Sequence, residues 1–182
     1  MKIRIGTRSS TLALWQAYFV RAALLKVDPE LEVELVRITT KGDMMRRARL
    51  ASATSTGLFT KAIELALIED KADVAVHSLK DLPTDLVEGL ELGAVPRRED
   101  PADALISKGD KGLQELPKGA IVLTGSPRRR AQLLDTRPDL EVRPIRGNVP
   151  TRINKLRRGR AHGLVLACAG LARLGMAHVA GE

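Results

Sequence analysis

The sequence predicts an α/β protein of two domains with mainly parallel sheets. Segments with the residue pattern of strands alternate with segments of helical periodicity in both halves of the chain. Between the halves, Pro96–Pro101 is charged, bracketed by prolines and without apolar periodicity, which is typical of a domain crossing. We therefore expect a first domain over residues 1–97 and a second over residues 98–182.

The composition excludes several classes of protein. Of the 182 residues, 44% are hydrophobic and only 2% aromatic, so we expect a soluble protein with an aliphatic core. A single cysteine, Cys168, excludes an intramolecular disulfide, and its apolar surroundings predict an inert buried thiol. The three histidines lack metal-ligand spacing, and we expect His77 to be a structural histidine bonded to the backbone. No segment resembles a signal peptide or a membrane span, which predicts a cytoplasmic protein.

The first domain begins with a strand over Lys2–Ile5 and a helix that Ser10 or Thr11 caps. Apolar residues at helical spacing predict the buried face of this helix: Leu12, Trp15, Phe19 and Ala23. The polar passage Thr40–Gly57 lacks periodicity, and a loop of this length is usually functional. The remaining elements expected here are strands at Glu32–Thr39, Val74–Val76 (buried) and Gly89–Val95, and a helix over Leu58–Glu69.

The second domain repeats the alternation. Ser126 and Pro127 suit the cap and first turn of a helix that runs through Asp135. The other expected elements are strands at Asp103–Ile106, Ala120–Leu123, Glu141–Ile145 and Gly163–Ala167, and a helix at Val149–Arg158.

Polar residues follow the strand at Val74. In open α/β sheets, ligands bind beyond the carboxyl ends of strands, which is where Ser78, Lys80 and Asp81 fall. For the Lys80–Asp81 dipeptide alone, a surface ion pair is the simpler interpretation. Arg8 and the hydroxyls that follow it surround a helix amino terminus, which is a natural anion site.

The second domain is strongly basic. Ala120–Arg160 contains ten Arg and one Lys against three acidic residues. Two arginine clusters, Thr124–Arg130 and Arg146–Arg152, occupy strand-to-helix turns, where the helix macrodipole disfavours cations unless an anion joins them. Because guanidinium groups bind carboxylates bidentately, two such turns facing Asp81 would form a polycarboxylate pocket. Three further arginines have a solvated helix surface as an equal alternative: Arg157, Arg158 and Arg160.

A basic surface also raises the alternative of nucleic-acid binding. The four aromatic residues are too few for base stacking, and no helix-turn-helix, RNA-recognition or zinc-finger pattern is present. We therefore expect a small polycarboxylate ligand, no nucleic-acid or membrane partner, no metal and a monomer.

Several longer segments resemble those of porphobilinogen deaminases, also called hydroxymethylbilane synthases. They follow in that family's order and spacing: Gly6–Ala17, Gly57–Lys61, Ala72–Pro83, Arg98–Pro101, Arg137–Leu140 and Arg146–Val149. The resemblance implies two domains similar to type II periplasmic binding proteins, with the active site in an interdomain cleft. It also implies a cytoplasmic transferase of tetrapyrrole (haem) biosynthesis, which joins four porphobilinogen units into hydroxymethylbilane and releases ammonia. In this family the growing chain is held by dipyrromethane, a cofactor bound to a cysteine.

By motif position, the resemblance implies that Asp81 is the catalytic carboxylate. Porphobilinogen that loses ammonia becomes a cationic azafulvene, which a carboxylate can stabilise while it shuttles a proton. The resemblance and the anion-site patterns together give the residues expected to bind substrate and cofactor carboxylates: Arg8, Ser10, Ser78, Lys80, Thr124, Ser126, Arg128, Arg129, Arg146 and Arg152.

The chain also departs from the family pattern. Thr56 stands where the family has a cofactor-binding lysine, Thr124–Pro127 differs from Thr-Ser-Ser-Leu, and His162-Gly163 replaces Asp-Ala. The family's third domain, with the attachment cysteine, is not matched, and Cys168 does not correspond to that cysteine. We therefore expect no covalently attached dipyrromethane on this chain. The alternative function is that of a non-catalytic polycarboxylate-binding relative that has lost the dipyrromethane-bearing domain.

Overall fold

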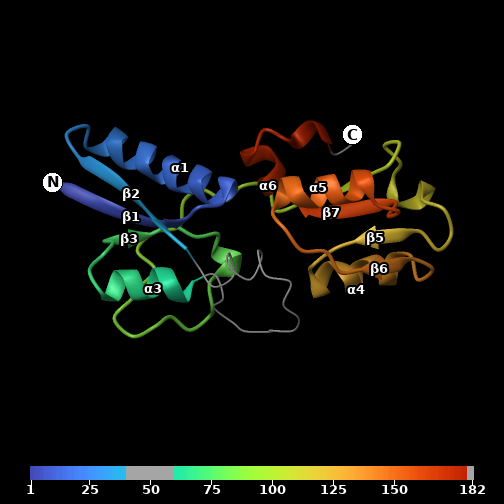
Figure 1. Ribbon diagram of the computed structural model, residues 1–182, viewed down its shortest axis with the longest axis horizontal. Coiled ribbons are helices and arrows are strands. Elements are labelled where there is room, and N and C mark those ends of the chain that lie inside the picture. The colour runs from blue at the N-terminus through green and yellow to red at the C-terminus, as the bar shows by residue number, and fades with distance from the viewer. Residues whose placement is uncertain (40–59, 180–182) are drawn as a thin grey trace. The chain divides into compact units, whose positions relative to one another are not determined.

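The computed structural model describes residues 1–39 and 60–179. The chain forms two compact units, which we call unit 1 (Met1–Pro96) and unit 2 (Arg97–Glu182). Each unit consists of a sheet with helices packed against it, and Figure 1 labels these elements. The predicted α/β class with mainly parallel strand pairs is confirmed.

The described residues of unit 1 form a three-stranded parallel sheet with the strand order β2-β1-β3. The first two strands pair along their whole length, from Lys2 opposite Glu32 to Arg8 opposite Ile38. Figure 1 shows helices α1 and α3 on opposite sides of this sheet. The elements are β1 (Lys2–Arg8), α1 (Thr11–Val27), β2 (Glu32–Ile38), α3 (Lys61–Ile68), β3 (Val74–Ala75) and a 3₁₀ helix, η1 (Leu79–Asp81).

Helix α1 begins at its predicted cap, Ser10, but it buries a different face from the predicted one. Ala17 is fully buried, whereas Trp15 and Phe19 are 36% and 46% exposed. Their rings stack on each other, with centroids 5.5 Å apart. Because Leu12–Val20 is apolar on more than one side, the spacing alone did not select the buried face. The small Ala17 side chain lets the helix lie close to the sheet, and the large rings remain outside.

One strand prediction in unit 1 is confirmed in position but not in burial, and another is wrong. The buried strand expected at Val74–Val76 is a two-residue strand at the edge of the described sheet, and Val74 is 40% exposed. The segment Gly89–Val95 forms no strand, and Leu92 and Val95 are 51% and 60% exposed. A strand requires a neighbour for its backbone hydrogen bonds, and the described residues supply none to this segment.

Unit 2 has a four-stranded mixed sheet with the strand order β4-β7-β5-β6. The last three of these strands are parallel, and β4 runs antiparallel to β7, with Asp103 opposite Ala167. The elements are β4 (Asp103–Ser107), η2 (Leu113–Glu115), β5 (Ile121–Leu123), α4 (Pro127–Thr136), β6 (Glu141–Arg143), α5 (Val149–Arg158), β7 (Gly163–Ala167), α6 (Cys168–Arg173) and η3 (Ala177–Val179).

The strands of unit 2 alternate their side chains between two aliphatic cores. Val122, Val142 and Val165 pack on one side with residues of α4. Leu164 and Leu166 point to the other side, where they pack with residues of α5 and α6. Since each fully buried aliphatic side chain contributes about 1.5–3 kcal/mol, these cores fix the sheet and therefore the ends of its strands.

Candidate functional site

The candidate residues of unit 1 lie beyond the edge of the sheet where β1 and β3 end. These strands are parallel, and Gly6 lies beside Ala75, so the segments that follow them leave the sheet at the same edge. Arg8 is the last residue of β1. Ser10 then caps α1, and its Oγ accepts a hydrogen bond from the backbone N–H of Ala13 at 3.4 Å.

Lys80 and Asp81 belong to the single 3₁₀ turn η1, which follows β3. The turn is tied to α1, because Gln16 Nε2 donates a hydrogen bond to Ser78 Oγ at 2.9 Å. Lys80 and Asp81 are both exposed, and no ion pair joins either of them to a residue in the described ranges. The structure therefore does not show the surface ion pair that is the simpler interpretation of this dipeptide, and both charges face solvent.

The charges of Arg8 and Asp81 both act on the pKa of His77. It is half-buried, and the backbone hydrogen bond expected for it is not formed among the described residues. Burial lowers the pKa of His77 below 6.5 and the charge of Arg8 lowers it further, whereas the charges of Asp81 and Glu64 act in the opposite direction. The imidazole is therefore neutral at neutral pH. Arg8 and Asp81 both lie close enough to His77 to influence its protonation.

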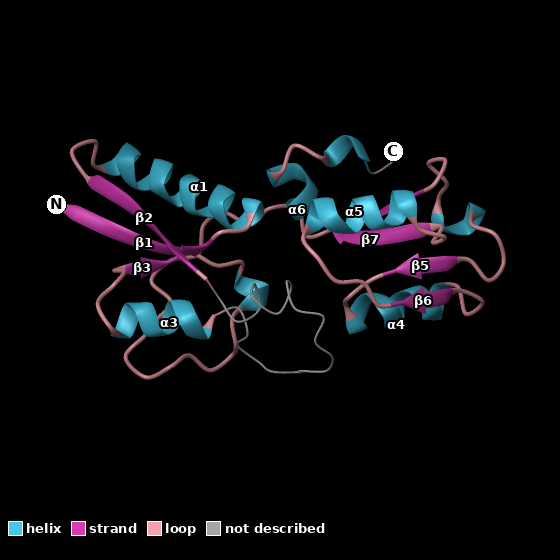
Figure 2. Cartoon of the chain, in the orientation of Figure 1, coloured by secondary structure: helices cyan, strands magenta, loops and turns pink. Residues whose placement is uncertain are grey.

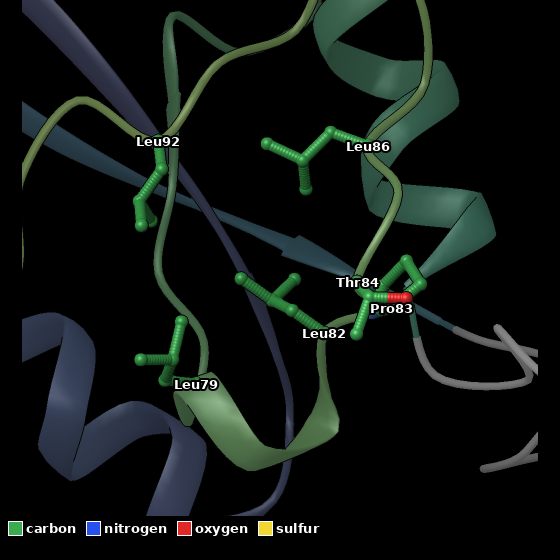
Figure 3. Close-up of a pocket in the computed structure, with 6 residues that line it drawn as sticks. All are labelled: Leu79, Leu82, Pro83, Thr84, Leu86 and Leu92. Carbon is green, nitrogen blue, oxygen red and sulfur yellow. The ribbon is translucent and has the colours of Figure 1, made fainter.

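An apolar cavity of about 280 Å³ adjoins the turn. In Figure 3 the side chains of Leu82, Leu86 and Leu92 point toward a common space. Leu79 and Leu82 flank the Lys80–Asp81 pair in sequence, so apolar surface lies next to the two charges. The cavity is lined by Leu79, Leu82, Pro83, Thr84, Leu86 and Leu92.

Unit 2 also gathers its candidate residues at one edge of its sheet. The arrows of β5, β6 and β7 point to the same edge in Figure 2. The turn after β5 leads into α4 through Ser126, and the turn after β6 leads into α5 through Asn148. These side chains accept hydrogen bonds from the backbone N–H groups three residues on, at 3.4 Å and 2.8 Å respectively. Two helix amino termini therefore lie at this edge, and both favour an anion.

The two turns touch each other. A Cβ atom added to Gly125 would lie 2.9 Å from the carbonyl oxygen of Ile145 and 3.8 Å from Arg152 Nη1. Arg152 Nε donates a hydrogen bond to the carbonyl oxygen of Gly147 at 2.8 Å. Arg146, in the same turn, is exposed and has no ion-pair partner among the described residues. The turns thus bring two guanidinium groups and two helix amino termini into one basic patch.

Thr124 has a supporting position in this patch. Its side chain is buried, and its Oγ1 accepts a hydrogen bond from the backbone N–H of Ser126 at 3.2 Å. The hydroxyl therefore holds the turn before α4.

Arg128 and Arg129 already have a partner within unit 2. Asp103 accepts hydrogen bonds from Arg128 Nη2 at 2.8 Å and from Arg129 Nη2 at 2.6 Å. Burial of the Asp103 carboxylate favours a higher pKa, but the hydrogen bonds from Arg129 and Arg128 outweigh it and lower the pKa. The sequence predicts that both arginines bind a ligand, and it does not predict that Asp103 binds them within the protein.

Three residues at these edges escaped the sequence interpretation: Gln16, Asp103 and Asn148. Asn148 could have been found, because an asparagine directly before a helical pattern is a common N-cap. Asp103 reaches the site only because β4 is antiparallel, which places its first residue beside the carboxyl end of β7. Nothing in the local sequence shows that direction, or that Gln16 contacts a residue 62 positions away.

The remaining features that the sequence singles out add no further residue to the candidate site. Thr56 lies outside the described residues. Cys168 is half-buried, and burial together with the charges of Asp100 and Asp103 raises the pKa of its thiol. Within residues 1–39 and 60–179, no group of three or more His, Cys, Asp or Glu side chains could hold a metal ion. No helix in those ranges combines the length and the apolar character that a membrane span requires.

Comparison with solved structures shows which fold this chain has. The chain matches the probable amino-acid ABC transporter extracellular-binding protein YtmK of Bacillus subtilis at 13% identity and a TM-score of 0.52, over 96% of this chain and 74% of that one. An ancestral arginine-binding protein bound to arginine matches at 16% identity and a TM-score of 0.48, over 99% and 76%. The fold is that of the type II periplasmic-binding-protein-like proteins.

The family follows from the sequence. The family model described as porphobilinogen deaminase, dipyrromethane cofactor binding domain, matches residues 3–182. The chain belongs to the porphobilinogen deaminase family.

Proposed function

We propose that the chain is the substrate- and cofactor-binding part of a hydroxymethylbilane synthase, a transferase that joins four porphobilinogen units and releases ammonia. The observation that carries this proposal is the Lys80–Asp81 turn. Both charges are exposed and unpaired among the described residues, and Arg8 lies near the same imidazole as Asp81. Membership of the porphobilinogen deaminase family supplies the reaction that such a turn would serve.

The proposed role of Asp81 follows from the charge that the reaction creates. When porphobilinogen loses ammonia, the remaining azafulvene is cationic, and a pyrrole carbon then attacks it and must lose a proton. An unpaired carboxylate beside this centre stabilises the positive charge and can accept that proton. Lys80 is the matching group for a substrate carboxylate.

The basic patch of unit 2 fits the carboxylates of dipyrromethane, because each of its pyrroles carries an acetate and a propionate. Bound dipyrromethane supplies the pyrrole end to which substrate units are added. Arg146 and Arg152 lie beside two helix amino termini, so an anion there gains both charge and backbone N–H donors. We propose that substrate and cofactor are held by Arg8, Ser10, Lys80, Ser126, Arg128, Arg146 and Arg152. Ser78, Thr124 and Arg129 act through the turns and helices that they hold in place.

A non-catalytic polycarboxylate-binding protein is the second candidate. It would use the same basic groups without turnover. The observation in its favour is the only cysteine, Cys168, whose raised thiol pKa disfavours the reactive thiolate. For either function we propose a cytoplasmic monomer with a small polycarboxylate pyrrole as ligand and without a nucleic-acid, membrane or metal partner.

Titration calorimetry with porphobilinogen tests the proposal. We expect the wild type to bind weakly, with an affinity that falls as salt is added, because partly exposed ion pairs are screened. Asp81→Asn should bind equally well or slightly more tightly, since the substitution removes a negative charge near the ligand carboxylates. Asp135→Asn, at an exposed position near the end of α4, is the matched control and should behave as the wild type.

The same substitution separates the two candidate functions. In a chain that turns over porphobilinogen, Asp81→Asn should abolish product formation while binding is retained. If Asp81→Asn instead eliminates binding, Asp81 positions the ligand or the turn, and its proposed catalytic role is wrong.

A further inference from the structure

One carboxylate in unit 2 bridges two neighbouring guanidinium groups. Asp103 Oδ1 accepts from Arg129 Nη2 at 2.6 Å, and Oδ2 accepts from Arg128 Nη2 at 2.8 Å. Asp103 is the first residue of β4 and lies opposite Ala167, the last residue of β7. The bridge therefore lies at the same edge of the sheet as the basic patch.

The two arginines differ in how firmly they are held. The Arg129 side chain is only 12% exposed, and its Nη1 also donates to the carbonyl oxygen of Val165 at 3.3 Å. Arg128 is 59% exposed, and its other contact is a hydrogen bond to Gln132, one turn along the same helix. Arg129 is thus packed against the sheet, whereas Arg128 can leave Asp103 without opening the core.

The charges at the bridge do not cancel. Two guanidinium groups share one carboxylate, so the cluster keeps an excess positive charge at an edge that already carries Arg146 and two helix amino termini. An incoming carboxylate is attracted by this excess, but it must compete with Asp103 for Arg128.

We propose that Asp103 is an internal carboxylate that a ligand carboxylate displaces from Arg128, so that Asp103 sets the affinity of the basic patch while Arg129 stays bound to it. The inference rests on the proposed function, because it takes a polycarboxylate as the ligand. Asp103 is a positioning residue in this scheme. It acts on the ligand only through Arg128.

A purely structural ion pair leads to the opposite expectation. If Asp103 served only to hold α4 on the sheet, removing its charge would loosen the site and weaken binding. If it competes with the ligand, removing its charge strengthens binding. The sign of the change in affinity therefore separates the two roles.

The experiment is a double-mutant cycle with Asp103→Asn, Arg128→Gln and the double variant, titrated calorimetrically with propane-1,2,3-tricarboxylate and with porphobilinogen. We expect Asp103→Asn to bind about two- to fivefold more tightly than the wild type, which corresponds to the strength of a partly exposed ion pair. The gain should disappear when Arg128 is already replaced. Glu141→Gln is the matched control. It breaks a two-bond arginine–carboxylate pair in the same unit, with Arg143, and changes the net charge equally.

The outcomes are distinguishable. If the wild type binds neither probe, the proposed function fails, and this inference fails with it. If the wild type binds but Asp103→Asn binds more weakly, only the role of Asp103 is refuted. The same holds if Asp103→Asn strengthens binding by the same factor when Arg128 has already been replaced by Gln. A gain of the same size in Glu141→Gln would reduce the effect to net charge and would also refute it.

Asp103→Asn leaves the Arg129 side chain without its counter-charge, which can destabilise the fold. A second measurement therefore uses the wild-type protein. The side-chain N–H signals of the arginines are followed by NMR during titration with the tricarboxylate, and Arg128→Gln assigns the signal of Arg128. We expect the Arg128 signal to shift while the Arg129 signal stays in place. Movement of Arg129 alone, or of neither signal at saturating ligand, contradicts the exchange.

Discussion

Gly125 controls how closely the two turns of the basic patch approach each other. A Cβ atom at this position would lie 2.9 Å from the backbone carbonyl oxygen of Ile145, and a backbone atom cannot move aside as a side chain can. We expect Gly125→Ala to lower the free energy of unfolding by about 1–3 kcal/mol, as overpacking does. Denaturant titration followed by circular dichroism measures this change. Gly170→Ala in α6, where the nearest atom is 3.8 Å away, should be neutral or stabilising.

His77 should make the folding stability of unit 1 depend on pH. Its pKa is lowered from 6.5, chiefly by burial, so the unfolded chain takes up a proton at a higher pH than the folded chain does. Stability should therefore fall as the pH drops below about 6.5. The decrease should level off below the lowered pKa of the folded state. Thermal unfolding of wild type and His77→Gln between pH 7.5 and 5 measures the contribution, as the difference between the two curves. His178→Gln, at an exposed position, should follow the wild-type curve.

Helices α4 and α5 begin at the edge of the sheet where the basic patch lies, and their N-cap hydrogen bonds differ in length. Asn148 Oδ1 lies 2.8 Å from its backbone partner, whereas Ser126 Oγ lies 3.4 Å from its own. We expect Asn148→Ala to cost about 1 kcal/mol of unfolding free energy and Ser126→Ala to cost less. Chemical denaturation of the two variants tests this order. Equal costs, or a larger cost for Ser126→Ala, would show that cap geometry does not set the stability of this edge.

Elements with a strong local pattern were predictable from the sequence. The helix at Val149–Arg158 and the strand at Gly163–Ala167 occur with the predicted bounds, because a helical repeat of apolar residues marks the first and a continuous apolar run marks the second. The wrong predictions concern long-range pairing. The apolar segment Gly89–Val95 has strand-like residues but no neighbouring strand among the residues that the structure describes, and α1 has more than one apolar face. Sequence likewise placed Arg128 and Arg129 at a helix start, but not the carboxylate that binds them across the sheet.

Considered as a whole, the molecule separates its charge between the units. Unit 1 contains 13 basic and 13 acidic residues, whereas unit 2 contains 17 basic and nine acidic residues, so unit 2 carries the entire net charge of +8. Unit 2 should therefore attract anions at long range through its net positive charge, and this attraction should weaken as the ionic strength rises.

The same chain should carry no covalent dipyrromethane. Its only cysteine is Cys168, whose thiol pKa is raised, and a thioether requires a reactive thiolate. We expect the intact mass of the 182-residue protein, made in cells that supply porphobilinogen, to equal that of the unmodified chain. The Cys168→Ser variant prepared in parallel identifies the attachment point if a mass increase does appear. A stoichiometric increase would show that this prediction is wrong.

The stacked pair on α1 has a practical consequence for all such measurements. Trp15 is the only tryptophan of the chain, and it lies on the same helix as Gln16, which ties down the Lys80–Asp81 turn. Its fluorescence is a built-in probe of unit 1. When unit 1 unfolds, Trp15 loses its stacking contact with Phe19 and its partly buried surroundings, and its fluorescence emission changes. Unfolding of unit 2 alone does not change this emission. An unfolding curve recorded by tryptophan emission and one recorded by backbone circular dichroism will therefore coincide only if the two units unfold as one.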